Sequence, residues 1–374
     1  MQDGLYVGLL SGTSVDGIDA ALLEWRNARP RLVHTRPHPL PNTVSSTIHA
    51  LCQSGDAEIE RLGRLDRELG YLFADAALAL LAEAGVDAAR IAAIGSHGQT
   101  VRHRPPSAGH GGHAFTLQVG DPNTIAERTG ITTVADFRRR DMAAGGEGAP
   151  LAPAFHAAAF GEADCMRAIV NIGGISNISL LDGTAVAAGF DSGPGNTLMD
   201  QWIARHERQD YDRDGRWAAR GTPQPELLTR LHCHPYLAKA GPRSTGREDF
   251  NMAWLEHQLE ELPGLSPVDV QATLAEFTAE SIATAIAAAT PEVSEVYLCG
   301  GGAHNGHLTR RLAALLPTIA LDSTAALGIA PDWVEAALFA WLAARTLSGL
   351  AGNAAQVTGA AGPRVLGAVY PGRI

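Results

Sequence analysis

The chain has 374 residues, a formal net charge of −11 and a sequence pI of about 5.7. This length predicts two domains with a substantial apolar core. With 45 % hydrophobic and 18 % charged residues, the composition excludes disorder as the main state. The acidic balance argues against a nucleic-acid-binding protein, because that affinity depends on neutralising phosphates with a basic surface.

The cysteines and the N-terminus indicate the compartment. Cys52, Cys165, Cys233 and Cys299 lack paired spacing, so the sequence predicts neither a disulfide scaffold nor a four-cysteine zinc site. The first residues carry no basic segment of the signal-peptide kind. No stretch approaches the ~18 to 20 apolar residues of a spanning helix. We therefore expect a cytoplasmic protein.

The first part of the chain alternates strand-like and helical patterns. Leu5–Leu10 and Ile18–Leu23 flank a turn of Gly, Ser and Asp residues, which predicts a hairpin. Apolar residues at three- and four-residue steps predict a helix over 60–84, with Gly85 as its stop. Ile91–Ile94 predicts a short strand that ends where polar residues begin, at a loop.

The second part of the chain echoes the first. Ala168–Ile172 enters a glycine turn and continues through two more strand-like runs to Phe190. Helical patterns cover 272–289 and 332–347, with a strand over 296–299 between them. The alternation predicts an α/β fold, and the echo predicts two related domains that face a cleft.

Three glycine turns combine strand ends with hydroxyl, amide or carboxylate groups, a combination that suits phosphate binding. They are Gly12–Gly17, Asp191–Asn196 and Gly300–Asn305. In the first, Asp16 offers a hard oxygen ligand for Mg²⁺; a solvated hairpin turn would use the same residues for backbone reasons. In the second, Asp191 is the best general-base candidate by position, with a turn or helix-cap aspartate as the alternative.

Neither of two common nucleotide-binding patterns is present in the sequence. The third turn lacks the Gly-x-Gly-x-x-Gly spacing, since position 305 is Asn, and the chain has no Gly-x-x-x-x-Gly-Lys-Ser/Thr segment. A Rossmann dehydrogenase and a P-loop kinase both lose support.

Seven strings resemble the anhydro-N-acetylmuramic acid kinase family from near the first residue to the end. They are GTSVDGID (12–19), SHGQT (96–100), the run over 120–156, NIGGISNIS (171–179), GFDSGPGN (189–196), RSTGREDFN (243–251) and CGGGAHN (299–305). The chain departs from the family pattern at Glu147, where Gln is usual, and at Asp249, where an apolar residue is usual. Its loop over 104–113 is longer than typical.

The resemblance implies the fold of the actin, Hsp70 and sugar kinase superfamily, with two ribonuclease-H-like α/β domains that face an interdomain cleft. Domain I would comprise 1–137 plus 333–374, and domain II 138–332. ATP and Mg²⁺ would be the cofactors, with Asp16 as the metal's carboxylate. The implied nucleotide-binding residues are Gly12, Thr13, Ser14, Val15, Asp16, Gly17, Ile18, Asp19, Gly173, Gly193, Gly195, Asn196, Gly300, Gly301, Gly302 and Asn305.

The implied reaction opens the 1,6-anhydro ring of 1,6-anhydro-N-acetylmuramic acid with water and phosphorylates the 6-oxygen. It yields N-acetylmuramic acid 6-phosphate and ADP, in peptidoglycan recycling. By resemblance Asp191 activates the water. The expected sugar contacts are His97, Gln99, Asp121, Asn123 and Arg138.

Alternatives remain open both for the sugar contacts and for the function. Arg138 and its two arginine neighbours could instead form a surface segment that is salt-bridged by Asp136 and Asp141. One rival is an ATPase of the same fold, a chaperone or filament subunit that uses no sugar. The other is a carbohydrate-binding or hydrolytic protein that never uses ATP. A homodimer is compatible with the apolar faces.

Overall fold

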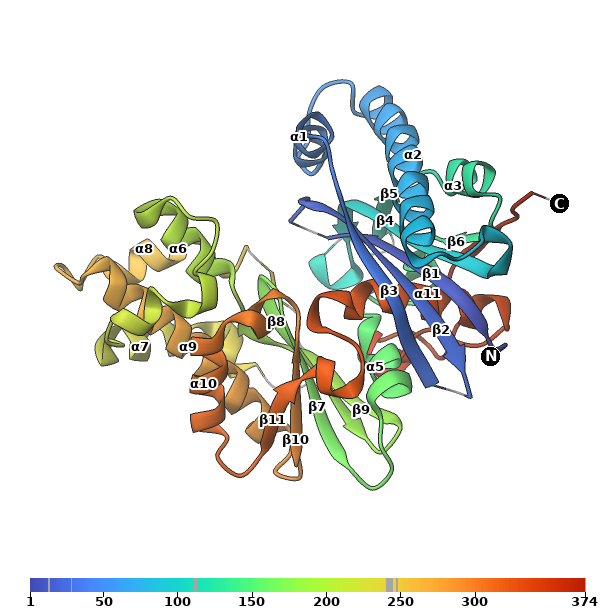
Figure 1. Cartoon of the computed structure of the whole chain (residues 1–374). Helices are drawn as coiled ribbons and strands as arrows, with labels where there is room; N and C mark the ends of the chain where they lie inside the picture. The colour runs from blue at the N-terminus through green and yellow to red at the C-terminus, as the bar shows by residue number, and fades with distance from the viewer. Residues whose placement is uncertain (13, 28, 110–112, 240–244, 247, 374) are drawn as a thin grey trace. The chain divides into compact units, whose positions relative to one another are not determined.

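The computed structural model describes residues 1–12, 14–27, 29–109, 113–239, 245–246 and 248–373 (Figure 1). The chain divides into two compact units, 1–159 with 333–374 and 160–332. The second division between the units lies before Trp333. The first lies at 159/160, beyond the expected 137/138, because residues 138–159 pack within the first unit.

The first unit holds a seven-stranded sheet in the order β12-β6-β4-β1-β2-β3, with β5 paired to β4. Its elements are β1 (Gly4–Ser11), β2 (Gly17–Arg26), β3 (Arg29–Pro39), α1 (Asn42–Leu51), α2 (Glu58–Ala84), β4 (Ile91–Arg104), β5 (Phe115–Val119), α3 (Pro122–Thr129), β6 (Thr133–Ala135), α4 (Arg139–Ala143), α5 (Ala152–Phe160), α11 (Val334–Leu347), α12 (Ala355–Thr358) and β12 (Ala368–Tyr370).

The helices α2 and α11 pack on opposite faces of this sheet. On one face, the apolar stripe of α2, including Leu69 and Phe73, packs with Val7 and Ile94 in a common core. On the other face α11 approaches so closely that a Cβ at Gly95 would lie 1.9 Å from the carbonyl oxygen of Phe339. As predicted, α2 stops at Gly85, which adopts φ 64° and bonds back to the last turn.

The second unit holds a five-stranded sheet in the order β11-β10-β7-β8-β9. Its elements are β7 (Met166–Ile172), β8 (Ile175–Asp182), β9 (Ala185–Pro194), α6 (Thr197–Glu207), α7 (Pro225–His232), α8 (Met252–Leu259), α9 (Pro267–Ala289), β10 (Glu295–Cys299), α10 (Gly306–Leu315) and β11 (Ala320–Ser323). The largely buried helix α9 contributes Phe277 and Ile282 to the core, which they form together with Val170 and Ile172 of β7.

The two units repeat one strand plan. In each, the first three strands are antiparallel neighbours, and two later strands add in parallel on the other side of the first strand. The orders are β3-β2-β1-β4-β6 and β9-β8-β7-β10-β11. This is the ribonuclease-H-like order, so the predicted fold class and internal duplication are confirmed. The turn between β7 and β8 is therefore the counterpart of the turn between β1 and β2.

One expectation about the polar segment after Ile94 was wrong. The strand does not end at a loop there, because β4 continues to Arg104. The reason is the strand β5, which pairs antiparallel with the second half of β4 from Gln99 to Arg104. Among the described residues, no helix has the length and apolar character needed to cross a membrane.

Candidate active site

The first turn, between β1 and β2, is held against β4. Ser11 donates from Oγ to Oε1 of Gln99 at 2.6 Å, and both side chains are buried. Val15 adopts φ 58°, and its carbonyl accepts a hydrogen bond from Ser45 Oγ. The turn is thus fixed from both sides. Of its predicted nucleotide-binding residues, Thr13 lies outside the described residues.

The carboxylate of Asp16 is exposed beside this turn and accepts a hydrogen bond from Ser14 Oγ at 2.8 Å. The described residues contain no group of three or more His, Cys, Asp or Glu side chains that could hold a metal by themselves. A single carboxylate fits Mg²⁺, which keeps several waters and usually binds through one or two carboxylates together with substrate phosphates. Asp16 is the residue that would hold it.

His97 and Arg138, both predicted sugar contacts, are joined directly. Arg138 Nε donates to His97 Nε2 at 3.0 Å, which makes that ring nitrogen an acceptor, so Nδ1 carries the proton and donates to the Gly98 carbonyl. Burial lowers the pKa of His97 well below its usual value, and the charge of Arg138 adds to the effect. The imidazole is neutral at pH 7.

The same guanidinium is anchored a second time. Arg138 Nη1 donates to the Gly148 carbonyl at 2.9 Å, and the guanidinium interacts electrostatically with Glu335 in the first turn of α11. Among the described residues, Nη2 has no hydrogen-bond partner. A fixed guanidinium with free donors is suited to a carboxylate ligand.

Asp121 and Asn123 form a separate group. Asp121 caps α3 by accepting the backbone N–H groups of Asn123 and Thr124, and it pairs with Arg67 at 3.2 Å. Burial by itself would raise the pKa of Asp121, but these hydrogen bonds outweigh it and lower the pKa. The side chain of Asn123 also donates to Asp121. This capping role explains the position of the Asp121 side chain, and no ligand is needed to explain it.

Glu147, which departs from the family pattern, contacts the loop that is longer than typical. Glu147 accepts hydrogen bonds from the backbone N–H and the Oγ of Ser107, the latter at 2.6 Å. Ser107 lies in the long loop over 104–113, of which residues 110–112 are outside the described residues. The carboxylate at 147 therefore anchors the beginning of that loop.

In the second unit, the segment 193–196 supports the turn between β7 and β8. The backbone N–H groups of Gly195 and Asn196 donate to the carbonyls of Gly174 and Gly173 at 2.9 and 2.8 Å. Asn196 Nδ2 donates to Ile172 at 3.1 Å. Sequence reasoning missed Gly174 as part of this site, although the echo between the two hairpins pointed to it.

Six glycines of these turns fall into two classes. A Cβ at Gly195, Gly300 or Gly302 would lie within 2.2 to 2.3 Å of a neighbouring atom, so packing alone requires glycine there. The other class comprises Gly12, Gly173 and Gly301, at which a Cβ would meet nothing closer than 3.5 Å and whose φ angles are outside the left-handed region.

Neither packing nor conformation requires glycine in the second class. The remaining reason is a ligand that approaches the backbone closely. At these three glycines the backbone is therefore open to a close approach. Gly12, Gly173 and Gly301 are among the residues that the family resemblance implies for nucleotide binding.

Asp191 lies near the end of β9, opposite Asn177 of β8. Its Oδ2 accepts the backbone N–H of Thr245 at 2.9 Å, and its carbonyl accepts the Tyr236 hydroxyl at 2.8 Å. Thr245 Oγ1 in turn donates to Asp249 at 2.6 Å. Asp249 is the other residue at which the chain departs from the family pattern. Thr245 orients the predicted base, and no local sequence pattern signalled that contact.

Asn305, a predicted nucleotide contact, is the N-cap of α10. Its Oδ1 accepts the backbone N–H of Leu308 at 3.0 Å. This position fixes the end of the Gly300–Asn305 turn against the start of the helix. A capping role therefore accounts for its side chain.

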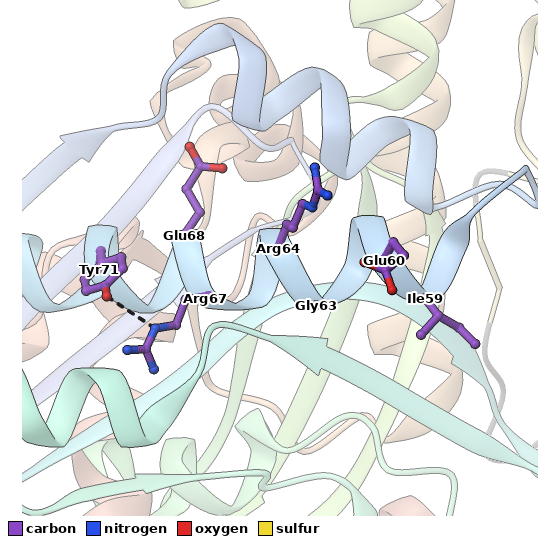
Figure 2. A pocket seen from close by; sticks show the side chains of 7 residues that line it. All are labelled: Ile59, Glu60, Gly63, Arg64, Arg67, Glu68 and Tyr71. Atoms are coloured by element: carbon purple, nitrogen blue, oxygen red, sulfur yellow. Dashed lines mark hydrogen bonds between the residues drawn. The ribbon is translucent and has the colours of Figure 1, made fainter.

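A shallow groove on the exposed side of α2 shares only Arg67, the partner of Asp121, with the residues described above (Figure 2). Its lining comes from that one helix: Ile59, Glu60, Gly63, Arg64, Arg67, Glu68 and Tyr71. The side chain of Arg67 bonds to the Tyr71 hydroxyl, as Figure 2 shows.

The model of the family described as Anhydro-N-acetylmuramic acid kinase matches residues 4–372. The chain is 52 % identical over 373 residues to the protein of that name from Shewanella loihica, covering 100 % of both. It is 50 % identical over 372 residues to that from Shewanella amazonensis, covering 99 % of this chain and 100 % of that one. A ROK hexokinase from Thermus thermophilus aligns over 91 % of this chain and 99 % of its own, with TM-score 0.39 and 15 % identity. The chain belongs to the anhydro-N-acetylmuramic acid kinase family.

Proposed function

We propose that this enzyme phosphorylates 1,6-anhydro-N-acetylmuramic acid on its 6-oxygen with ATP while water opens the 1,6-anhydro ring. Water forms the new bond to C1 as the bond between C1 and O6 breaks. O6 takes the γ-phosphoryl group from ATP, which leaves ADP. The product is N-acetylmuramic acid 6-phosphate, an intermediate of peptidoglycan recycling in the cytoplasm.

The observation that carries the proposal is the pair of equivalent turns with glycines that the fold does not need. Gly12 in the β1–β2 turn and Gly173 in the β7–β8 turn both leave the backbone open to a ligand. An open glycine turn of this kind, found in each of the duplicated hairpins, suits a phosphate group. Full-length membership of a kinase family supports the same conclusion.

Asp191 is the general base in this proposal. The carboxylate takes the proton of the attacking water, and the hydrogen bond from the Thr245 N–H holds one of its oxygens in place. No separate acid is needed at O6, because phosphoryl transfer consumes the charge of the departing oxygen. Arg138 would bind the lactyl carboxylate of the sugar through Nη2.

Mg²⁺, held by Asp16, would neutralise the charge on the ATP phosphates. The proposed substrate is a small sugar, and the proposal includes no nucleic-acid partner. A homodimer is compatible with the proposal, and analytical ultracentrifugation would establish the state of assembly.

The experiment that tests the reaction supplies 1,6-anhydro-N-acetylmuramic acid, ATP and Mg²⁺ in ¹⁸O-enriched water, with mass spectrometry of the product. We expect one new phosphate and one labelled oxygen at C1. Unchanged sugar with slow ATP hydrolysis would refute the assigned substrate.

Asp191→Asn tests the base separately. The amide keeps the shape and an acceptor for Thr245 but takes up no proton, so turnover should fall by about 10²- to 10⁴-fold while ATP binding persists. Asp182→Asn, at the exposed last residue of β8, is the matched control and should retain full turnover. Near-wild-type turnover in Asp191→Asn would show that another group is the base.

A further inference from the structure

Two hydrogen bonds from different segments of the second unit hold the proposed base, Asp191. Its Oδ2 accepts the backbone N–H of Thr245 at 2.9 Å, which orients the side chain. Its backbone carbonyl accepts the Tyr236 hydroxyl at 2.8 Å, which fixes the main chain at that point of β9. Both contacts lead onward to one residue, Asp249.

The first path to Asp249 runs through the side chain of Thr245. Thr245 Oγ1 donates to Asp249 Oδ2 at 2.6 Å. Hydrogen bonds to carboxylates are among the stronger ones in proteins. Thr245 therefore joins two carboxylates, since its N–H donates to Asp191 and its hydroxyl donates to Asp249. By holding the hydroxyl, Asp249 also restrains the residue whose N–H meets the base.

The second path to Asp249 runs through His234. The imidazole accepts the backbone N–H of Tyr236 at Nδ1, over 3.2 Å, and the ring is also hydrogen-bonded to the backbone of Asp249. Burial lowers the pKa of His234, although the contacts with Asp249 oppose the shift, so the ring is neutral at pH 7. A neutral ring can keep Nδ1 as the acceptor for Tyr236.

Aromatic packing fixes the main chain at Asp249. The next residue, Phe250, is fully buried and belongs to the core of the second unit. The centroid of its ring lies 4.4 Å from that of His234 and 5.9 Å from that of Tyr236. The Asp249 carboxylate therefore extends from a rigidly packed segment, and it can hold Thr245 in one place.

We propose that Asp249 is a positioning residue for the base: through Thr245 it holds the Asp191 carboxylate in the orientation that takes the proton of the attacking water. This inference rests on the proposed function, in which Asp191 is the base. The apolar residue that is usual in the family at this position cannot accept a hydrogen bond from Thr245. This chain therefore has an additional hydrogen-bond acceptor that acts on the base.

Asp249→Leu removes the acceptor and introduces the residue type that is usual in the family. Because Thr245 is then less restrained, kcat with the anhydro sugar should fall about tenfold, while the KM for ATP stays the same. Asp249→Asn keeps an acceptor for the hydroxyl and should recover most of the lost turnover. Glu260→Leu, at the exposed C-cap of α8, is the matched control and should retain full turnover.

A double-mutant cycle tests whether Asp249 acts through Thr245. Thr245→Val removes the hydroxyl but keeps the backbone N–H, so it should lower kcat by about the same factor as Asp249→Leu. If both residues act through one contact, the double variant should be no slower than either single variant. Losses that multiply in the double variant would mean that Asp249 acts by another route, such as the packing of its segment, and would overturn the proposal.

Hydrogen exchange of the Thr245 amide tests the contact independently of turnover. The amide exchanges when its bond to Asp191 opens. In the full-length protein, NMR should therefore show exchange about tenfold faster in Asp249→Leu than in the wild type, and close to the wild-type rate in Asp249→Asn.

Three results would each overturn the proposal: unchanged kcat in Asp249→Leu, equal losses of kcat in Asp249→Leu and Asp249→Asn, or unchanged exchange in Asp249→Leu. Failure of the proposed function gives a different result, because the wild type itself would then leave the anhydro sugar unchanged. The exchange rates would in that case still show whether Asp249 holds Thr245 against Asp191.

Discussion

Arg138 donates from Nε to His97 Nε2 at 3.0 Å and from Nη1 to the Gly148 carbonyl at 2.9 Å. These two bonds hold the plane of the guanidinium and fix the neutral tautomer of the imidazole. The pair joins β4 to the segment after β6, two parts of the first unit that are 41 residues apart in the chain. The remaining nitrogen can then serve a ligand in one orientation.

Arg138→Lys should therefore be a severe change although the charge is kept. An ammonium group lacks the planar fork that satisfies two protein acceptors and a carboxylate at once. We expect the KM for the anhydro sugar to rise about tenfold or more while the KM for ATP stays the same. Steady-state kinetics with each substrate varied would check this, with Arg140→Lys, an exposed neighbour, as control. A rise in the KM for ATP alone would contradict the assignment of Arg138 to the sugar.

Gly301 and Gly302 are adjacent but should respond differently to alanine. A Cβ at Gly302 would lie 2.2 Å from Ile172 Cγ2, so Gly302→Ala should destabilise the protein by about 1–3 kcal/mol through overpacking. A Cβ at Gly301 meets nothing closer than 4.0 Å. Gly301→Ala should leave the stability intact and raise the KM for ATP about tenfold.

Urea denaturation and ATP kinetics on the two variants separate packing from ligand approach. The interpretation of Gly301 would be wrong if Gly301→Ala bound ATP as the wild type does.

Much of the fold was predictable because its signals are local. The hairpin at Gly12–Gly17 and the end of α2 at Gly85 depend on residues within one turn. The length of β4 was not predictable, since its second half is a strand only through pairing with β5. The contact between Asp191 and Thr245 spans 54 residues with no periodic pattern, so only the folded chain reveals it.

His156 should make stability depend on pH. The residue is buried, and burial lowers its pKa from 6.5 to about 3. The stability that the neutral imidazole contributes is fully present above pH 6.5, the pKa of histidine in the unfolded chain. It is lost as the pH falls toward 3, because only the unfolded chain then takes up the proton. At pH 5 the loss amounts to about 2 kcal/mol.

In His156→Gln, the difference in the free energy of unfolding between pH 7 and pH 5 should shrink by about 2 kcal/mol. Urea denaturation at both pH values provides the measurement. His49→Gln, at an exposed position on α1, should keep the wild-type difference. An unchanged difference in His156→Gln would mean that the imidazole is protonated in the folded protein.

Asp141 is the last buried carboxylate to test. The sequence leaves open that Asp141 is a surface partner of the arginines, but the residue is fully buried. It accepts three hydrogen bonds, from the Gly148 N–H, Asn353 Nδ2 and Thr358 Oγ1. It ties the segment after α4 to the C-terminal part of the first unit. Asp141→Ala should cost about 3 kcal/mol, since it leaves buried donors without an acceptor.

Thermal denaturation and limited proteolysis of Asp141→Ala would show both a lower Tm and earlier cleavage near residues 353–358. Arg140→Ala, one position before, removes an exposed side chain and should stay within about 0.5 kcal/mol of the wild type. If Asp141→Ala were as stable as Arg140→Ala, the three hydrogen bonds would contribute nothing net, and the C-terminal segment would be held by apolar packing around residues such as Leu366 instead.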